Sequence, residues 1–383
     1  MAHGEIAAAG DGDRQRRCLV GLSLVPGLGP VRVARLIGHF GSPETAWTAP
    51  PEALADVPGI GRVIAAAIAA ARGADDVDVA LRQADGRGAR VVTWLDAGYP
   101  VRLRGIPASP PVLYVRGTWR DDRPSVAIVG TRRATPYGLG VAERLAAALA
   151  GQEVTIVSGL ARGIDAAAHH AVVRAGGSTV GVLACGVDVA YPPEHRSLID
   201  AMAVRGALVA EAPMGAPPER GCFPARNRLI SGLADAIIVI EARLGSGALI
   251  TARQAAVQGR AVFAVPGSVY ARGSEGPHRL LAAGAKVVTG PDDVLAALGR
   301  PTIGAQDGDR YGPTAPDLTP PERRVIAALD DGEARSIDGL AIAAGISVAE
   351  AAATLVALEL RGLVRRIAGG LYANDQTSRR PQI

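Results

Sequence analysis

The stretch SVAIVG (125–130) is a continuous apolar run that ends in glycine, and six similar runs follow it along the chain. They are VTIVSG (154–159), TVGVLACG (179–186), ALVAEAP (207–213), AIIVIEA (236–242), AVFAVPG (261–267) and KVVTG (286–290). The runs do not alternate strictly between apolar and polar residues. Intervals of about 20 to 30 residues with helical patterns separate most of them, as expected for parallel strands buried on both faces. They predict an α/β fold with a doubly wound, mainly parallel sheet.

The composition of the 383-residue chain agrees with this fold class. Hydrophobic residues make up 48% of the sequence, enough for at least one large core in a chain long enough for two or three domains. Aromatic residues make up only 3%, whereas there are 48 glycines. The strands must therefore be built mainly from Val and Ile and the loops from Gly. This composition favours an α/β fold over a β-sandwich.

Positive charge is concentrated in the middle of the chain and is almost entirely guanidinium. Residues 101–300 contain 22 Arg and Lys against 15 Asp and Glu, and Lys286 is the only lysine. Guanidinium groups bind phosphate bidentately and stack on bases, so an anionic partner is favoured for this region. General solubility and a genome-wide preference for Arg remain as alternative explanations.

The three cysteines and the hydropathy pattern predict a cytoplasmic protein. Cys18, Cys185 and Cys222 are widely separated and match neither a metal-binding CxxC spacing nor a disulfide framework, which fits a reducing compartment. The sequence contains no run of about 18 uncharged apolar residues that could cross a membrane. We expect no metal, no cofactor and no membrane association.

Two short repeats precede the predicted sheet. VPGLGP (25–30) and VPGIGR (57–62) are each followed by a helical apolar pattern, which is typical of a helix-hairpin-helix (SAM-like) domain and is assigned to residues 18–90. Backbone N–H groups of such a turn can hold a DNA phosphate, although a packing or protein-contact role fits equally well. Residues 1–17 are polar and rich in Gly and Ala, so a disordered leader is expected there.

The C-terminal part predicts a separate small domain. A stretch rich in Pro, Gly and Asp (301–319) predicts a linker after the core at 91–300. Three helical patterns followed by LVRRIAGGLYA (363–373), a hairpin pattern, predict a winged-helix domain at 320–375 with a tail at 376–383.

The third helix of the winged-helix domain lacks the side chains of a base reader. It carries Glu350, Glu359 and mostly Ala where a duplex-reading helix would carry Arg, Lys, Asn or Gln. A DNA-facing wing through Arg365 and Arg366, or a protein-contact role, is expected instead of sequence-specific reading of duplex DNA.

Candidate binding residues follow the first two strands of the predicted sheet, at the carboxyl edge where open α/β sheets bind ligands. A short turn after the first strand offers backbone amides and a guanidinium that can hold a phosphate. This turn is neither GxGxxG nor GxxxxGK[ST], and no acidic residue ends the second strand, so a dinucleotide dehydrogenase and a P-loop ATPase are disfavoured. The candidates in these two loops are Gly130, Thr131, Arg132, Ser158, Gly159, Arg162 and Gly163.

Two predicted helix starts carry further polar side chains. Asp165 can cap the helix after the second strand, and His169 lies one turn later on the same face, so an Asp–His pair is possible. A structural cap is favoured over an acid–base role, and no catalytic residue is predicted. Ser246, Gly247 and Thr251 open another helix whose amides and hydroxyls could hold a phosphate or serve only as a cap.

The most informative stretch is RGCFPARNR (220–228), which gathers basic residues around one of only three phenylalanines. Phe before Pro in a basic loop is poorly explained by core packing. Stacking of a base on Phe223, with Arg226 or Arg228 on the backbone, is the arrangement used for single strands. The alternative is a loop anchor with salt-bridged arginines.

Seven ordered segments between residues 99 and 289 resemble the DprA/Smf (DNA processing) family. They are YPVRLRGIPASPPVLYVRG (99–117), AIVGTRRATPYG (127–138), SGLARGIDAAAHHAV (158–172), GVLACGVDVAYPPEHRSLI (181–199), FPARNRLISGLADAIIVIEA (223–242), SGALITARQAAVQGRAVFAVPG (246–267) and GPHRLLAAGA (276–285). Family members often carry an N-terminal helical hairpin domain and a C-terminal winged-helix domain, so the resemblance extends over most of the chain.

The resemblance implies an extended Rossmann fold that binds single-stranded DNA, dimerises, protects incoming strands and helps load the RecA recombinase in natural transformation, without a catalytic reaction. Two positions depart from the family: Thr131 stands where Ser is usual, and His278 where Asn is common. Arg220 looks like an additional basic contact. By motif position, the implied DNA contacts are Gly130, Thr131, Arg132, Phe223, Arg226 and Asn227.

Two other functions compete with this prediction. The core also resembles nucleotide-processing Rossmann hydrolases of the lysine-decarboxylase-like group, which carry a PGGxGTxxE motif. The comparable stretches LGSGALITA (244–252) and VPGSVYARG (265–273) lack a Glu in register to act as a base. A duplex-binding transcription regulator would rest on the winged-helix pattern alone. The sequence therefore favours a single-stranded-DNA-binding protein.

Overall fold

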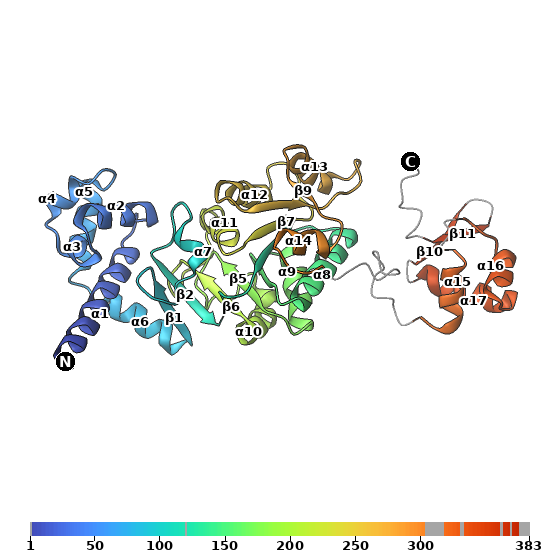
Figure 1. The fold of residues 1–383 in the computed structure, drawn as a ribbon, viewed down its shortest axis with the longest axis horizontal. Helices are drawn as coiled ribbons and strands as arrows, with labels where there is room; N and C mark the ends of the chain where they lie inside the picture. The colour runs from blue at the N-terminus through green and yellow to red at the C-terminus, as the bar shows by residue number, and fades with distance from the viewer. Residues whose placement is uncertain are drawn as a thin grey trace. The chain divides into compact units, whose positions relative to one another are not determined.

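The computed structural model describes residues 2–118, 121–302, 318–329, 333–360, 363–367 and 370–374. The chain divides into two compact units, Met1–Gly304 and Ala305–Ile383 (Figure 1). The predicted linker at 301–319 lies mostly outside the described residues, and the predicted tail at 376–383 lies wholly outside them.

A mixed sheet of nine strands, counted over the described residues, forms the centre of the first unit, in the order β1-β2-β6-β5-β4-β3-β7-β8-β9. All seven predicted runs form strands. These seven, which lie side by side in the order β6-β5-β4-β3-β7-β8-β9, are parallel to one another. The strands are β1 (Ala89–Thr93), β2 (Val112–Gly117), β3 (Ser125–Val129), β4 (Thr155–Ser158), β5 (Thr179–Leu183), β6 (Ala207–Ala210), β7 (Ala236–Val239), β8 (Ala261–Ala264) and β9 (Lys286–Val287).

Sequence reasoning missed β1 and β2, which pair antiparallel with each other and extend the sheet beyond β6. They precede the first long apolar run, and β1 places the exposed Arg90 between buried residues. A short strand with a polar position gives a weaker signal than a strand buried on both faces.

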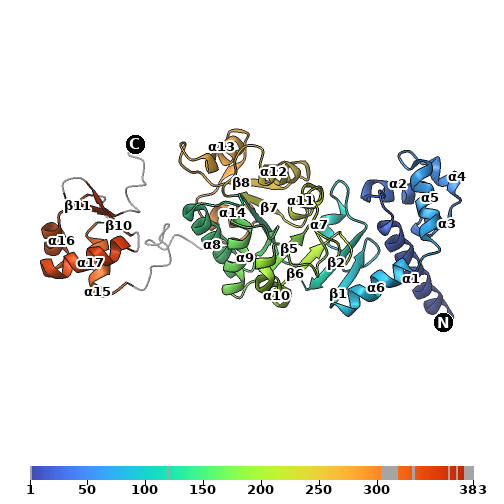
Figure 2. The same ribbon diagram turned by 180° about the vertical axis from the view of Figure 1, so that it is seen from behind.

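Helices cover both faces of the parallel part of the sheet, which explains why its strands are continuously apolar. Val126 and Ile128 of β3 pack with one helical layer, whereas Ala127 and Val129 pack with the other. Figures 1 and 2 show the two layers on opposite sides of the strands. The first layer contains α8 (Pro136–Gly151), α9 (Ile164–Arg174) and α14 (Pro291–Ala297); the second contains α7 (Val101–Arg104), α11 (Cys222–Gly232) and α12 (Gly247–Val257).

The strand order reverses direction between β3 and β7, which are neighbours in the sheet although three strands, β4, β5 and β6, separate them along the chain. Connections before this point lead toward β6 and those after it lead toward β9. In open α/β sheets, ligands bind near the carboxyl ends of the strands close to such a reversal. The doubly wound prediction is confirmed.

The N-terminal helices pack on the antiparallel end of the sheet and share one apolar core with it and α10 (Arg196–Arg205). Each hairpin repeat precedes a helix, as predicted. The helices are α1 (Ala2–Leu24), α2 (Pro30–Phe40), α3 (Pro43–Thr48), α4 (Pro51–Ala55), α5 (Gly61–Ala71) and α6 (Asp76–Gly86).

Where a disordered leader was predicted, the structure has the first part of α1, which spans Ala2–Leu24. Three arginines of this stretch are tied to distant carboxylates. Arg14 Nε lies 2.7 Å from Glu44 Oε1, and Arg17 Nη2 lies 2.5 Å from Asp78 Oδ1. Arg14, Arg16 and Arg17, which contributed to the polar character of this stretch, are thus ion-pair partners of other elements.

The sheet ends at β9, a strand of two exposed residues. Its Lys286 places the ammonium group 5.8 Å from the centre of the Phe263 ring on β8. A short, charged edge strand offers little backbone for pairing with another chain.

The second unit has the predicted winged-helix arrangement. Three helices, α15 (Pro320–Ala327), α16 (Ile337–Ala344) and α17 (Val348–Leu360), surround an apolar core and are followed by the antiparallel pair β10 (Val364–Ile367) and β11 (Leu371–Asn374). Among the described residues, no single helix is long and apolar enough to cross a membrane, although α16 and α17, bent by 104°, meet that criterion together.

Candidate nucleic-acid interface

A small open hollow, here called the pit, lies at the carboxyl ends of β4 and β5. Its volume is about 40 Å³, far below the several hundred Å³ of sites that enclose a whole small ligand. Loops after β3, β4 and β5 and the first turns of α11 form its walls. The lining residues are Arg132, Gly159, Leu160, Ala161, Arg162, Leu183, Ala184, Cys185, Tyr191, Pro192, Phe223 and Arg226.

Two aromatic rings and one guanidinium form the accessible part of the pit. The ring centres of Tyr191 and Phe223 are 5.7 Å apart with an interplanar angle of 50°, and Tyr191 is 37% exposed. The guanidinium carbon of Arg132 lies 5.2 Å from the centre of the Phe223 ring. Arg132 itself is exposed, and no ion pair of the described residues includes it. The pit therefore offers aromatic surface next to an uncompensated positive charge.

The basic loop predicted around Phe223 is instead the start of α11, which begins at Cys222. Proline in a first helical turn loses no hydrogen bond, so Pro224 does not interrupt the helix. The helix turns Phe223 toward the pit and carries the next three polar residues inward, where Arg226, Asn227 and Arg228 are all buried.

Arg226 differs most from its predicted role as a phosphate contact. Its side chain is 7% exposed, and Nη1 donates to Gly159 O at 2.8 Å and to Val182 O. It joins the ends of β4 and β5 from below the pit. Burial lowers the pKa of Arg226 to about 10, and the nearby Asp165 opposes that shift. The guanidinium thus reaches the lining of the pit but is committed to the fold.

Asp165 is the buried counter-charge of Arg226. It does not cap α9, whose N-cap is Gly163; its Oδ2 accepts from Gly159 N at 3.2 Å and Ala161 N at 3.4 Å. Burial raises the pKa of Asp165 to about 6, and Arg226 opposes the rise.

The predicted Asp–His pair is not formed, because His169 bonds elsewhere. Its Nδ1 lies 2.7 Å from Thr179 Oγ1 on β5, inside the core. Burial lowers the pKa of His169 to about 3. The neutral imidazole is a packing element between α9 and the sheet.

Asn227 and Arg228 also serve internal contacts. Asn227 Nδ2 donates to Gly247 O at 3.3 Å, which ties α11 to the first turn of α12. Arg228 Nη2 donates to both carboxylate oxygens of Glu211, at 2.9 and 2.7 Å. The salt-bridge alternative is therefore the one observed for Arg228.

The predicted glycines bring the loops together. Gly163 has φ +78°, and a Cβ on it would lie 2.4 Å from Thr131 O. A Cβ on Gly159 would lie 2.8 Å from both Arg226 Nη2 and Asp165 Oδ2, and one on Gly130 would meet Ile164. These positions need glycine for close backbone approach.

The remaining candidates of the first two loops divide between interior and surface. Ser158 is fully buried and its hydroxyl donates to Ile128 O at 2.6 Å, so it is not at the surface. Thr131 N donates to Glu241 O at 2.7 Å. Arg162 is exposed at the rim of the pit and pairs with Glu194. Arg220 is exposed before α11 and does not line the pit.

The start of α12 lies beside α11, and its polar groups face inward. Thr251 Oγ1 donates to Gly247 O at 3.1 Å, and Ser246 Oγ is a buried hydroxyl without a partner among the described residues. His278 bonds to Gly267 O at 3.0 Å. Among the described residues, no cluster of His, Cys, Asp and Glu is suited to a metal ion.

Comparison with known families covers most of the chain. Residues 90–299 match the family described as DNA recombination-mediator protein A, residues 310–370 match the DprA winged helix domain, and residues 21–73 match a SAM-like helix-hairpin-helix tandem. The chain belongs to the DprA/Smf family. Protein Smf of Synechocystis sp. is 36% identical over 384 residues, which cover 91% of this chain and 96% of that protein.

Further relatives support membership of the chain in the DprA/Smf family. A putative DNA processing protein DprA of Mycobacterium tuberculosis is 42% identical over 306 residues, covering 76% of this chain and 78% of that one. The solved DprA structure of Streptococcus pneumoniae matches with a TM-score of 0.63 and 33% identity, covering 73% and 95%. A DprA structure of Helicobacter pylori, described for its single-stranded DNA binding mode, matches with a TM-score of 0.50 and 30% identity, covering 55% and 95%.

Sequence reasoning missed two residues of this DprA-like core. Tyr191 forms half of the aromatic surface, and the only signal was an aromatic residue in a strand-to-helix loop of a chain with few aromatics. Glu241 follows β7 and joins it to the loop after β3, because its carboxylate accepts from Thr135 Oγ1 at 2.5 Å and Thr135 N at 3.0 Å. A charged residue that ends a buried apolar run was its signal.

Proposed function

We propose that this DprA/Smf protein binds single-stranded DNA at the pit, with a base against Phe223 and Tyr191 and a phosphate on Arg132. The observation that carries the proposal is the stack in which the uncompensated Arg132 guanidinium lies over the Phe223 ring, next to the exposed Tyr191. Aromatic surface combined with positive charge is how proteins bind single strands without sequence preference.

The shape of the pit favours an unpaired base over a duplex. A hollow of about 40 Å³ can accept the edge of a ring but does not enclose a nucleotide. A base can reach it only when it is free to leave a stack, as in a single strand. The Helicobacter pylori relative described for its single-stranded DNA binding mode supports the same ligand.

We propose that the protein acts by binding rather than by catalysis. Among the described residues, those that line the pit include no Asp, Glu or His to act as an acid or base. This composition disfavours the hydrolase alternative. Arg226, Asn227 and Arg228 then act indirectly, because they hold α11 so that Phe223 faces the pit.

Family membership extends the proposal to the cellular role. We propose a cytoplasmic homodimer that protects incoming single strands and helps to load RecA recombinase in natural transformation. Light scattering of the protein with and without oligo-dT tests the dimer, and a strictly monomeric mass at micromolar concentration would contradict it. RecA filament formation on strands coated with a single-strand-binding protein tests the loading; no acceleration by the protein would contradict that role.

Fluorescence anisotropy of labelled oligo-dT at several salt concentrations tests the pit. Phe223→Ala removes the stacking ring and is expected to weaken binding about 5- to 150-fold with little change in salt dependence. Arg132→Ala is expected to lower the slope of log affinity against log salt by about 0.7, because one phosphate contact is lost. Arg82→Ala, at an exposed position on α6, is the matched control.

Two outcomes would move the DNA site elsewhere. Wild-type affinity in folded Phe223→Ala and Arg132→Ala proteins would contradict the pit, and so would tighter binding of duplex than of single strands. Nucleobase or phosphate released from nucleoside monophosphates in the same preparations would favour the hydrolase instead.

A further inference from the structure

A second hollow of about 610 Å³ lies between α2 and the segment 94–109, on the side of the N-terminal helices. We call it the α2 groove. Ala34 and Arg35 line it from α2, and Trp94, Arg104 and Ile106 line it from the core. Its volume falls in the range of about 300 to 1,000 Å³ that small-ligand sites occupy, unlike the pit.

The two arginines give the α2 groove an uncompensated positive charge. Arg35 Nη1 donates to Pro58 O at 3.2 Å, and Arg104 donates to Trp94 O at 2.7 Å and Asp96 O at 3.0 Å. These acceptors are neutral carbonyls, which orient a guanidinium but leave its charge. No ion pair of the described residues includes either arginine.

Asp96, the one carboxylate in the segment 94–109, is already used. Asp96 Oδ2 accepts from Thr93 N at 2.6 Å and Thr93 Oγ1 at 3.0 Å, and it pairs with Arg16 Nε at 3.4 Å. Arg104 meets only the backbone oxygen of Asp96. The α2 groove therefore selects for an anion.

Trp94 adds an aromatic surface to the same wall. Its Nε1 donates to Ser109 Oγ at 3.1 Å, which fixes the indole, and the half-buried side chain lines the α2 groove. A fixed tryptophan beside two guanidiniums is the combination that stacks a base and holds its phosphate. An acidic protein segment would use the charges but has no need of the ring.

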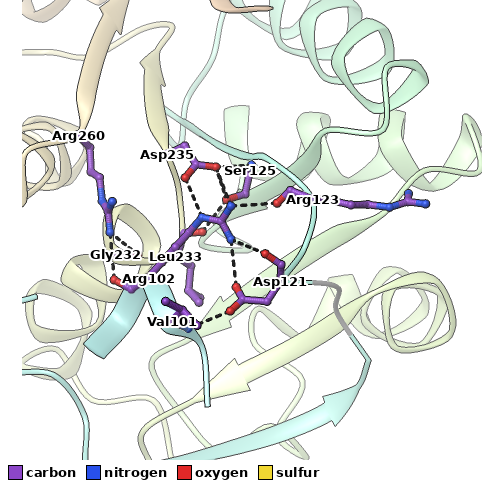
Figure 3. Close-up of polar contacts among 9 residues, drawn as sticks. All are labelled: Val101, Arg102, Asp121, Arg123, Ser125, Gly232, Leu233, Asp235 and Arg260. Atoms are coloured by element: carbon purple, nitrogen blue, oxygen red, sulfur yellow. Dashed lines mark hydrogen bonds and ion pairs between the residues drawn. The ribbon is translucent and has the colours of Figure 1, made fainter. Parts of the chain in front are cut away.

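A network of polar contacts holds the core wall in place (Figure 3). Arg102 lies on α7, the same short helix as Arg104. It donates to Asp235 at 2.7 and 3.0 Å and to Asp121 at 3.0 Å. Asp235 also accepts from Ser125 N at 2.8 Å, so α7 is tied to β3. A wall fixed before binding loses little conformational entropy when the ligand arrives.

We propose that the α2 groove is a second nucleotide-binding site on the same single strand, with the phosphate between Arg35 and Arg104 and the base on Trp94. The proposal rests on the proposed function, because the strand bound at the pit is the ligand. It gives the N-terminal helices a direct part in holding DNA, through the face of α2 rather than through the hairpin turn alone.

Ala34→Glu tests the α2 groove without removing a contact. Ala34 is exposed on α2 and lines the groove, so the added carboxylate repels a phosphate there. Ala66→Glu is the matched control, because Ala66 is exposed on α5 and does not line the groove. For a long oligo-dT, anisotropy is expected to show about 5-fold or greater weakening with Ala34→Glu, the lower end of one lost stacked nucleotide, and no change with Ala66→Glu.

Photo-cross-linking of the full-length wild-type protein to oligo-dT with scattered 5-iodouracil supplies a readout independent of folding in the variants. Mass spectrometry is expected to find cross-links at Trp94 and also at Tyr191 or Phe223. Cross-links at Tyr191 or Phe223 without Trp94, together with unchanged affinity of Ala34→Glu, would overturn the α2 groove and leave the pit standing. Cross-links at none of the three would refute both proposals.

Competition separates nucleic acid from an acidic protein segment. Poly-glutamate carries the charges but no bases, so at matched charge concentration the Trp94 cross-link is expected to persist. If poly-glutamate abolishes the Trp94 cross-link while the one at the pit survives, the α2 groove is a protein-docking site and the proposal is wrong.

Discussion

Arg226→Met is expected to destabilise the fold, whereas Arg132→Met is expected to leave stability unchanged and weaken DNA binding. Methionine keeps most of the side-chain length and removes the charge. Arg226 is 7% exposed, donates to two strand-end carbonyls and faces Asp165. Arg132 is exposed at the pit. The two arginines thus separate a structural role from a binding role.

The size of the effect follows from what Arg226 leaves behind. Removing one of two neighbouring opposite charges inside the protein costs about 3 to 5 kcal/mol, because the other charge remains buried without compensation. The loss of donors to Gly159 O and Val182 O acts in the same direction. We expect the free energy of unfolding of Arg226→Met to fall by about 3 to 5 kcal/mol near neutral pH.

The pH dependence identifies Asp165 as the group left unpaired. Burial raises the pKa of Asp165 to about 6 in the presence of Arg226, which opposes the rise. Without Arg226 the pKa of Asp165 rises further, so the folded variant gains a proton that the unfolded chain does not bind. A raised folded pKa gives stability that is present at low pH and is lost as pH increases through it. The penalty of Arg226→Met is therefore smaller near pH 5 than near pH 8.

Urea unfolding followed by circular dichroism, at the two pH values, measures both quantities. Equal stability of the Arg226→Met and Arg132→Met proteins would refute the structural assignment. So would a penalty that is the same at both pH values. Loss of salt-dependent oligo-dT binding by a fully stable Arg226→Met protein would return Arg226 to the role of a phosphate contact.

Three further predictions concern other parts of the protein. Burial lowers the pKa of His169 to about 3 from about 6.5, so wild type should lose about 2 kcal/mol relative to His169→Asn between pH 7 and pH 5; parallel stability curves would contradict this. Arg102→Ala should lower the free energy of unfolding by about 2 kcal/mol or more, and Arg102→Lys should not restore it because an ammonium cannot bridge Asp235 and Asp121 together; full rescue by Lys would argue against the bidentate contact. Removing residues 320–383 should leave oligo-dT binding largely intact, because α17 carries Glu350 and Glu359 rather than basic residues; loss of binding by a folded truncated protein would place a DNA site there.

The parallel sheet could be predicted because burial on both faces leaves a trace in the sequence. Its inner strands β3 to β7 are buried at every position, so the run from Val126 to Val129 is continuously apolar. β1 and β2 carry polar residues and lie outside the doubly wound part of the sheet. They therefore give a weaker apolar signal in the sequence. The part of the helix at residues 14–17 was missed because its arginines are held by ion pairs to distant elements.

The site was predictable in its chemistry but not in its geometry. Phe223 and Arg132 were identified because a rare aromatic and a Gly–Thr–Arg turn are unusual in this sequence, and the structure brings the two together. Arg226 and Arg228 are of the same residue type as Arg132, and no local pattern distinguishes a buried guanidinium from an exposed one. Their positions depend on α11, whose start at Cys222 places them against the sheet.

The edge strand β9 offers an experimental handle, because it carries the single lysine of the sequence on an exposed position. An amine-reactive fluorophore would attach at Lys286 and otherwise only at the chain's α-amino group. The pit follows β4 and β5, on the other side of β3 and β7 from this edge. Energy transfer from Lys286 to dyes on the 5′ or 3′ end of a bound oligonucleotide would therefore differ between the two ends, and would reveal the polarity with which the strand crosses the sheet.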